Sequence, residues 1–374
     1  MKRVRLRELG IEIGQLPTGA HNAITDVPGV LVGHATIVMD KPRVARTGVT
    51  VILPRAGDIW RDHAFAAMHS FNGDGEMTGS HYVAEFGLLH TPIAITNTHQ
   101  VGVVRDELVQ YGHELGGADI FSLPVVAETY DGWLSDASGA HVRAQHVRAA
   151  IANAGSGPVA EGNVGGGTGM ICHEFKGGIG PSSRMVSAGG NTYTLGALVQ
   201  ANYGARHLLR VDGVPVGRTL DVKRVPSAWN EAAPAEGSII VVLATDAPLL
   251  AVQCKRLAQR ATVGLARVGG VGHNGSGDIF ICFATGNHVS PKAQTEIPLT
   301  MLPHPQLNQF FEAVAEVVEE SILNALTSAE TMHGFQGRVA HALPLDELQA
   351  LLARRIAACI VRAAGAAGGR NKHE

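Results

Sequence analysis

The chain has 374 residues, of which 45% are hydrophobic and 17% charged, and its formal net charge is −3. A chain of this length can bury a large core, in one big α/β domain or two smaller ones. The near-neutral charge argues against partners such as nucleic acid or an anionic membrane surface, and no apolar run approaches the ~20 residues of a membrane span.

Strand-like and helix-like segments are mixed along the chain. Short aliphatic runs predict strands over residues 30–38, 49–53, 93–96, 121–126, 238–245 and 279–285. Helical periodicity predicts helices over 104–115, 139–154, 248–266, 307–327 and 346–363, and the tail from 365 looks frayed. No repeat and no long linker separates these elements. The pattern therefore predicts a layered α/β or α+β architecture.

Two helices carry more specific expectations. Asp246, ahead of Pro248, is placed to cap the helix that follows it. The helix over 308–325 has an apolar face, and its glutamates fall largely on the opposite face, which predicts a solvated acidic surface; they are Glu312, Glu316, Glu319 and Glu320.

The four cysteines lie far apart in apolar surroundings and form no CxxC pair; they are Cys172, Cys254, Cys282 and Cys359. This usage predicts buried, reduced thiols in a cytoplasmic protein and argues against a structural zinc site.

The most informative position is the pair Gly237-Ser238. A Pro- and Ala-rich loop, residues 229–236, runs into Gly237, and at Ser238 the sequence becomes a continuous aliphatic run. Such a run predicts a strand buried on both faces. A serine hydroxyl after a glycine at this junction could attack the preceding carbonyl and cut the chain. The freed α-amine, with a pKa near ~8, could then serve as a general base. An ordinary turn before a strand is the alternative.

Three further stretches carry candidate site residues, each with a plain structural alternative. Ser276 and Asp278 precede a buried strand and could relay a proton, or simply form a glycine-rich turn. Glu128 could bind a substrate ammonium and Tyr130 could donate to an oxyanion, or both could belong to a capped turn; Trp133 of the same stretch is assigned with Glu128 to substrate binding. Asn202 could donate to an oxyanion or sit in a turn before Gly204.

The glycine-rich segment Gly162–Gly169 has two interpretations. It could cradle a phosphate, but no Lys-Ser/Thr follows it and no clean GxGxxG opens a helix, so a tight backbone turn is favoured. No serine lies in a GxSxG motif, which excludes the α/β-hydrolase nucleophile elbow. An N-terminal nucleophile is then the main route to serine chemistry.

Taken in order, these motifs resemble the DmpA-like family, which includes L-aminopeptidase/D-amidase-esterases and β-peptidyl aminopeptidases. Nine stretches across nearly the whole chain carry the resemblance: 26–30, 71–79, 96–99, 128–132, 162–170, 200–204, 237–248, 276–278 and 324–332.

The resemblance implies a four-layer αββα sandwich, similar in its layers to N-terminal-nucleophile hydrolases but differently connected. It implies a single self-processing domain, cut between Gly237 and Ser238 into an α chain, residues 1–237, and a β chain, residues 238–374. It further implies a homo-oligomer of αβ units, octamers among them, with no metal or organic cofactor.

The site residues follow from the same resemblance. Ser238 is the expected nucleophile, Ser276 and Asp278 assist proton transfer, Asn202 belongs to the oxyanion hole and Tyr130 lies beside the reacting carbonyl. The expected activity is removal of N-terminal residues, D- or β-residues included, from short peptides, amides or esters through an acyl-enzyme. Two alternatives stay open: an acyltransferase like ornithine acetyltransferase, whose nucleophile is Thr, and a non-catalytic binding protein using the Gly162–Gly169 loop.

Overall fold

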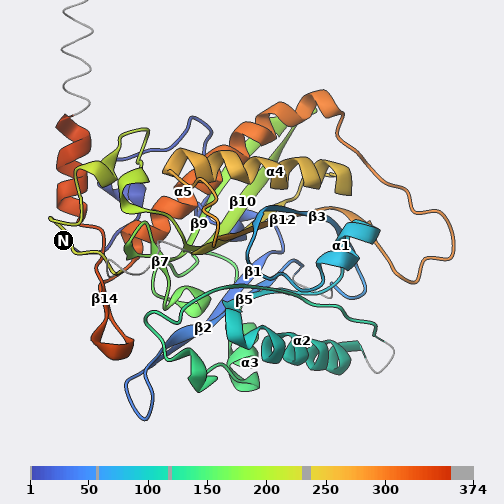
Figure 1. Ribbon diagram of the computed structural model, residues 1–374. Coiled ribbons are helices and arrows are strands. Elements are labelled where there is room, and N and C mark those ends of the chain that lie inside the picture. Colours follow the sequence, from blue (N-terminus) through green and yellow to red (C-terminus); the bar gives the residue numbers. More distant parts are fainter. Residues whose placement is uncertain (1, 56–58, 117–119, 230–236, 355–374) are drawn as a thin grey trace, which may run out of the picture.

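The computed structural model describes residues 2–55, 59–116, 120–229 and 237–354. Two β-sheets lie face to face, and helices cover the outer face of each (Figure 1). Helices α4 (Ala251–Val268) and α5 (Asn308–Ser328) pack on one sheet, and α2 (Val101–Gly116) and α3 (Ala144–Ala152) pack on the other. The four layers confirm the αββα architecture predicted from the resemblance.

The smaller sheet has four strands in the order β1-β2-β5-β6, and only β5 and β6 run parallel. Its strands are β1 (Leu31–Met39), β2 (Ala45–Leu53), β5 (Ile93–Asn97) and β6 (Val125–Thr129). The strand predicted over 121–126 was placed too early, because Pro124 has no N–H to give to a ladder. Glu128 consequently lies within β6, opposite Thr96 of β5, and not in a turn after the strand.

The larger sheet has six strands in the order β4-β3-β12-β11-β10-β9, and only β11 and β12 run parallel. They are β4 (Leu88–Leu89), β3 (His63–Gly73), β12 (Gly277–Val289), β11 (Ser238–Thr245), β10 (Asn191–Asn202) and β9 (Gly178–Ala188). Strands β3, β9 and β10 were not predicted. They contain many small or polar residues and lack a continuous aliphatic run, and β9 tolerates Pro181 because it forms the edge of the sheet.

Strand β11 matches its predicted range, 238–245, and all eight of its residues are buried. Ile239, Val241 and Leu243 pack toward α4 and α5, whereas Ile240 and Val242 pack in the layer between the two sheets. By the two-residue period of a strand, Ser238 shares the inter-sheet face of Ile240. Asn202, which pairs with Ser238, is in phase with Leu198, which also packs between the sheets.

The smaller elements complete the fold. Helix α1 (Ser80–Phe86) packs beside β3, and two short hairpins are β7 (Ile171–Cys172) with β8 (Phe175–Lys176) and β13 (Met332–His333) with β14 (Val339–Ala340). Residues 345–354 are helical, as predicted, while the rest of the helix predicted to 363, the tail from 365 and Cys359 lie outside the described residues.

Asp246 does not cap α4, contrary to the sequence prediction. The helix begins at Ala251 with Leu250 as its N-cap, and the Leu250 N–H donates to the side chain of Gln253. The Asp246 carboxylate instead accepts the Thr194 N–H at 2.7 Å and so ties the end of β11 to β10.

The glutamates of α5 are the larger correction. Glu316, Glu319 and Glu320 are buried, and Glu320 has no exposed surface. Arg184 of β9, also fully buried, donates to Glu316 at 2.7 Å and to Glu320 at 2.6 Å. The predicted solvated acidic face is therefore wrong for these three. The sheet beneath α5 supplies a cation to Glu316 and Glu320, and Arg267 of α4 pairs with Glu319 at 3.4 Å.

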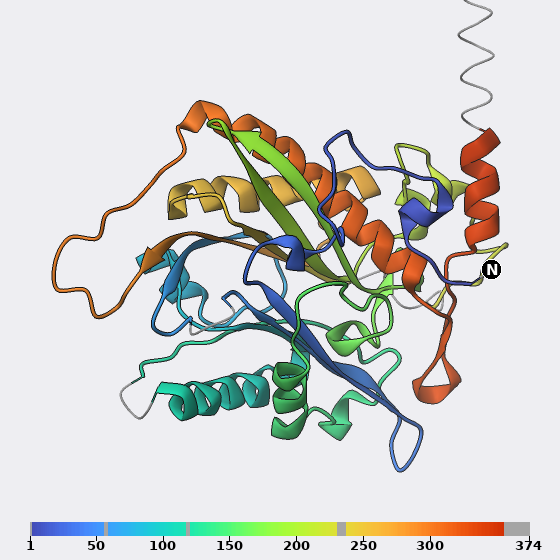
Figure 2. The ribbon, with the colours of Figure 1, turned by 180° about the vertical axis from the view of Figure 1, so that it is seen from behind.

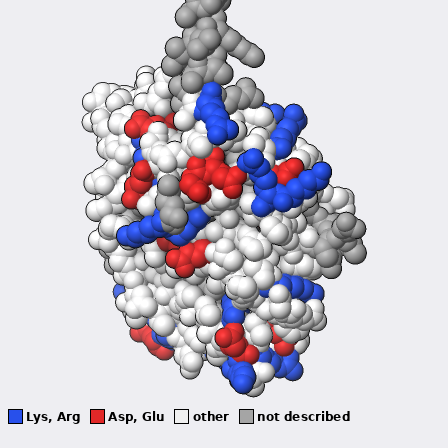
Figure 3. Space-filling view, turned by 90° about the vertical axis from the view of Figure 1, so that its left-hand side faces the viewer, with Lys and Arg blue, Asp and Glu red and all other residues white. Residues whose placement is uncertain are grey.

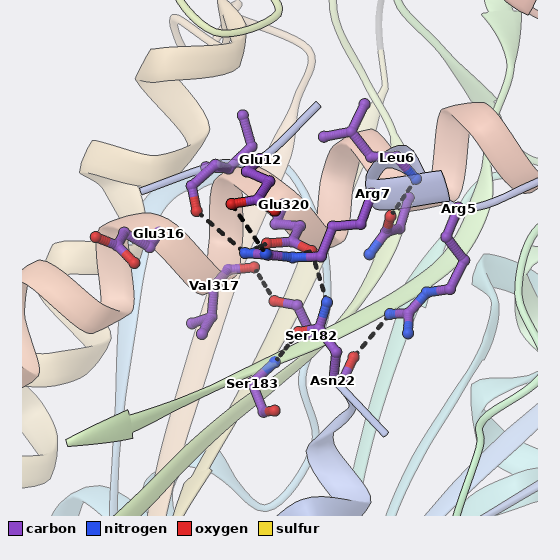
Figure 4. A network of polar contacts seen from close by, with 12 residues as sticks. Arg5, Leu6, Arg7, Glu12, Asn22, Ser182, Ser183, Glu316, Val317 and Glu320 are labelled. Atoms are coloured by element: carbon purple, nitrogen blue, oxygen red, sulfur yellow. Dashed lines mark hydrogen bonds and ion pairs between the residues drawn. The ribbon is translucent and has the colours of Figure 1, made fainter. Parts of the chain in front are cut away.

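The N-terminal segment completes this ionic cluster. It runs alongside α5 in Figure 2, and Figure 4 shows Arg7 reaching Glu320. Arg7 Nε donates to Glu320 at 2.8 Å, and Asn22 Nδ2 donates to the same carboxylate at 2.6 Å. Burial acts to raise the pKa of Glu320, but the hydrogen bond from Arg7 and the charges of both arginines outweigh it and hold that pKa below its ordinary value.

Other sequence expectations concern the thiols and the surface. Cys172, Cys254 and Cys282 are buried and free, as predicted. On the face shown in Figure 3, acidic and basic side chains are intermingled and do not form one continuous basic patch. In the part of the chain that the structure describes, no helix is both long and apolar enough to cross a membrane.

Candidate active site

A cleft of about 330 Å³ opens at the end of the two sheets where β10 finishes and β11 begins. The six-stranded sheet contributes Ser238 and Asn202, and the four-stranded sheet contributes Glu128 and, just beyond it, Tyr130. The full lining is Asp74, Gly75, Glu76, Thr98, Glu128, Tyr130, Asn202, Trp229, Gly237, Ser238 and Gly275. The cleft thus brings together residues that are far apart in the sequence.

Gly237 holds the backbone of the predicted cleavage site against β10. A Cβ at this position would lie 1.9 Å from the carbonyl oxygen of Asn202, so no side chain fits without moving the strand. Most of the loop before it, residues 230–236, lies outside the described residues. The close approach places the Gly237–Ser238 peptide directly beside Asn202.

Ser238 is 6% exposed, and its Oγ accepts the Gly277 N–H at 3.2 Å. Next to it, Ser276 Oγ donates to Asp278 Oδ1 at 2.6 Å, and the Asp278 carboxylate also accepts the Ile239 N–H. Burial raises the pKa of Asp278 to about 6, against the lowering effect of both hydrogen bonds. The predicted serine and acid therefore form a hydrogen-bonded pair next to Ser238.

The side-chain amide of Asn202 is oriented by two backbone groups. Its Oδ1 accepts the Ile171 N–H at 2.8 Å, and its Nδ2 donates to the Tyr130 carbonyl oxygen at 3.0 Å. Among the described residues no second acceptor takes the other Nδ2 hydrogen. The amide can therefore present one N–H to an oxygen in the cleft.

An acidic wall faces these residues. Glu128 is 3% exposed and accepts hydrogen bonds from the Glu76 N–H at 3.0 Å and from the Thr98 hydroxyl. Burial, followed by the nearby charges of Glu76 and Asp74, raises the pKa of Glu128. Asp74, Glu76 and Thr98 were not identified from the sequence, although Asp74 and Glu76 lie in the 71–79 stretch that carried the family resemblance.

The two aromatic residues that were predicted to belong to the site, Tyr130 and Trp133, lie in different places. Tyr130 is half exposed at the cleft, with its ring 5.7 Å from that of His99. Trp133 does not line the cleft; it packs edge-on against Trp229, with ring centroids 4.9 Å apart, and donates to the Ala228 carbonyl oxygen at 2.7 Å. Trp229, which the sequence analysis did not select, is the indole that reaches the cleft.

The glycine-rich segment packs between the sheets and is not arranged to bind a phosphate. The Gly165 and Gly166 N–H groups donate to the hydroxyls of Thr36 and Thr50 at 2.8 and 3.1 Å. A Cβ at Gly166 would come within 2.7 Å of the Ile95 carbonyl oxygen. The interpretation as a tight backbone turn is therefore the better one.

Within the described ranges, no group of three or more His, Cys, Asp or Glu side chains could hold a metal.

Comparison with known proteins places this cleft in a class of enzymes. The model of peptidase family S58 matches residues 22–340. The β-peptidyl aminopeptidase BapA of Sphingosinicella microcystinivorans is 46% identical over 372 residues, which cover 95% of this chain and 93% of that protein. BapA of Sphingosinicella xenopeptidilytica is 40% identical over 374 residues, covering 94% of this chain and 91% of that protein.

Solved structures agree. A β-aminopeptidase of Burkholderia sp. superposes with a TM-score of 0.88 at 50% identity, covering 94% of this chain and 99% of that one. The L-aminopeptidase D-Ala-esterase/amidase of Ochrobactrum anthropi, described as a variant of the Ntn-hydrolase fold, superposes with a TM-score of 0.88 at 43% identity, covering 94% and 98%.

The fold is thus that of an aminopeptidase with an Ntn-hydrolase-like sandwich. The chain belongs to peptidase family S58, which confirms the resemblance to DmpA-like proteins. It is an aminopeptidase, and the family match favours this activity over the acyltransferase and the binding protein.

Proposed function

We propose that the chain activates itself by cutting the Gly237–Ser238 bond. Ser238 Oγ attacks the Gly237 carbonyl, the C–N bond breaks as nitrogen takes a proton, and an ester forms between Gly237 and Ser238. Water hydrolyses this ester to give a Gly237 carboxylate and a free Ser238. The single observation that supports the proposal is a serine at the first position of a buried strand, in a cleft, after a glycine that no other residue can replace without moving β10.

In the mature enzyme, residues 1–237 and 238–374 would form the α and β chains of one self-processing domain. Ser238 Oγ attacks the carbonyl of a substrate's first residue, and its own α-amine, assisted by Ser276 and Asp278, accepts the proton. The short Ser276–Asp278 hydrogen bond beside Ser238 supports this relay. Water then resolves the acyl-enzyme.

The oxyanion would be stabilised by the free Nδ2–H of Asn202 and by the Gly277 N–H, which already points at Ser238 Oγ. Removing one such donor typically lowers the rate about 10²- to 10³-fold. Tyr130 lines the same cleft, and its own backbone carbonyl oxygen accepts the other Nδ2–H of Asn202.

The substrate's free ammonium would bind at the acidic wall, with Glu128 as its main partner. Three carboxylates line the cleft, and its described lining includes no Lys or Arg. This charge balance supports short peptides, amides or esters with an unblocked N-terminus. Trp133 would act on binding only by holding Trp229 in place. The relatives' names make β-residues a reasonable first class of substrate to test.

Two finer expectations accompany this function. We propose that αβ units assemble into a homo-oligomer, octamers among the candidates, and that the protein acts in the cytoplasm, as its reduced thiols suggest. Native mass measurement tests the first and fractionation of the producing cells tests the second.

The denatured intact mass of freshly purified protein tests self-cleavage. We expect two species, residues 1–237 and 238–374, and one uncut, inactive species for Ser238→Ala. Ser238→Cys and Ser238→Thr keep a nucleophile and should cut slowly. A Ser238→Ala chain that is still cut at residue 237 would overturn the proposal.

A further inference from the structure

Lys176, the last residue of β8, is fully buried beneath the glycine-rich segment. Its Nζ donates to three backbone carbonyl oxygens: Met170 at 2.8 Å, Gly177 at 2.8 Å and Gly167 at 3.3 Å. No carboxylate of the described residues forms an ion pair with it. The ammonium group is therefore held only by backbone carbonyl dipoles.

A lysine in this place needs an explanation, because burying an ammonium without a counter-ion is unfavourable. Burial lowers the pKa of Lys176 to about 7. An apolar side chain would avoid this penalty but would remove one donor from each of three converging carbonyls. Two of these carbonyls also accept a backbone N–H: Met170 from Gly177 at 2.9 Å and Gly167 from Met170 at 3.3 Å. The position thus uses the one aliphatic side chain that ends in three N–H donors.

Two of the carbonyls that Lys176 binds, those of Gly167 and Met170, belong to the segment that leads into Ile171 and orients Asn202. Met170, bound through its oxygen, immediately precedes Ile171, and Ile171 pairs with Lys176 across the β7–β8 hairpin. The Ile171 N–H is the group that binds Asn202 Oδ1 at 2.8 Å. Lys176 Nζ therefore anchors the Met170–Ile171 peptide group, whose N–H binds Asn202.

That bond decides which end of the amide faces the cleft. With Oδ1 held by an N–H, Nδ2 must point toward the Tyr130 carbonyl and Ser238. If the Ile171 N–H moved away, the carboxamide could turn over and present its oxygen, which would repel a developing oxyanion. A displacement of the order of 1 Å in a supporting group is enough to cost about 10²-fold in rate.

We propose that Lys176 is a positioning residue: acting through Met170 and Ile171, it holds the Asn202 amide with an N–H directed at the reacting carbonyl. The inference rests on the role of Asn202 in the proposed function. If Lys176 only stabilised the fold, its replacement would have the same effect whether or not residue 202 carried an amide. A positioning residue should instead affect kcat only when the Asn202 amide is present, and this difference can be measured.

The test is a double-mutant cycle with Lys176→Met, Asn202→Ala and the double variant. kcat and KM are measured on a chromogenic β-alanyl anilide, with rates expressed per cleaved chain as counted by intact mass. We expect Lys176→Met to lower kcat about 10- to 100-fold with KM changed less than threefold, and Asn202→Ala to lower it about 10²- to 10³-fold. The double variant should be no slower than Asn202→Ala alone, because the target of Lys176 is then already missing.

Two further variants keep the test decisive. Lys176→Gln retains two N–H donors, should fold if Lys176→Met does not, and should keep most of kcat. Lys255→Met is the matched control, because Lys255 also donates to a backbone carbonyl, that of Met68 at 2.6 Å, on an element outside the cleft; its kcat should be unchanged.

The outcomes separate the two proposals. The positioning role would be overturned if the kcat of the double variant fell by the product of the two single-variant losses. It would also be overturned if Lys176→Met had a normal kcat, and in both cases Asn202 would keep its role in the oxyanion hole. An Asn202→Ala enzyme with normal kcat would overturn the oxyanion role and the positioning role together.

Discussion

Buried carboxylates occur in two regions of this molecule, and the chain stabilises them in opposite ways. Under α5, Glu316 and Glu320 contact Arg184, and Glu320 also contacts Arg7. The cations come from the protein itself, and the pKa of Glu320 lies below its ordinary value despite burial.

At the cleft and next to it, the buried carboxylates of Glu128, Asp131 and Asp278 receive only hydroxyl and backbone N–H donors. Burial raises the pKa of Glu128, that of Asp131 to about 7 and that of Asp278 to about 6. Asp131 follows Tyr130 and does not itself line the cleft; among the described residues its Oδ2 has no hydrogen-bond partner. The α5 carboxylates are thus paired with cations of the chain itself, whereas the cleft carboxylates are not, which supports the proposal that a substrate ammonium binds there.

The largest effect is expected from breaking the α5 cluster. Arg184→Met leaves two glutamates buried with fewer partners. We therefore expect the free energy of unfolding, measured by urea titration, to fall by about 3–5 kcal/mol. The matched control is Arg148→Met, which removes a partly exposed ion pair with Glu107 and Glu114 and should cost no more than about 1 kcal/mol. Equal losses in the two variants would show that burial does not set the strength of these contacts.

The reverse pattern is expected at the acidic wall. Glu128→Gln should lower kcat/KM about 10- to 100-fold, the usual worth of a charged hydrogen bond, while stability stays equal or rises because a disfavoured buried charge is removed. Steady-state kinetics and urea titration on the same samples check both parts. Glu114→Gln, on the surface, is the control and should retain full activity. A Glu128→Gln enzyme with normal kcat/KM would mean that the ammonium binds elsewhere.

The smallest effect concerns the pH dependence of stability. The folded-state pKa of Asp131, about 7, lies above the ordinary value of 3.8. The stability contributed by this group is therefore fully present below the unfolded pKa and is lost as pH rises through about 7. The stability of Asp131→Asn relative to the wild type should therefore increase between pH 5 and pH 8. Thermal unfolding across this range measures the difference, and a constant difference would contradict the assignment.

Sequence reasoning succeeded where one local segment carries the whole signal. Strand β11 was predicted to the residue because an aliphatic run buried on both faces needs no partner to be recognised. The Ser276–Asp278 contact follows from spacing along one strand. Strands β9 and β10 were missed because small and polar residues occupy positions that only packing against α5 and the glycine-rich segment makes suitable.

The site shows the same division. Ser238, Asn202 and Glu128 could be chosen from motifs, but Trp133 was selected when its neighbour in space, Trp229, is the residue that lines the cleft. These two residues lie almost a hundred positions apart, and their pairing depends on how two loops meet.

The sequence by itself determined the family, the layered α/β class and the strand that begins at Ser238, because these depend on residue type and local order. Only the tertiary structure decided which charges are buried and which partners they meet. Glu320 and Arg184 are separated by more than a hundred residues, and no periodicity in α5 distinguishes a solvated glutamate from one that faces an arginine across a sheet. Burial and pairing are properties of the packed layers. They decide whether a buried carboxylate meets a cation of the chain, as Glu320 does, or only hydroxyl and backbone N–H donors, as Glu128 does.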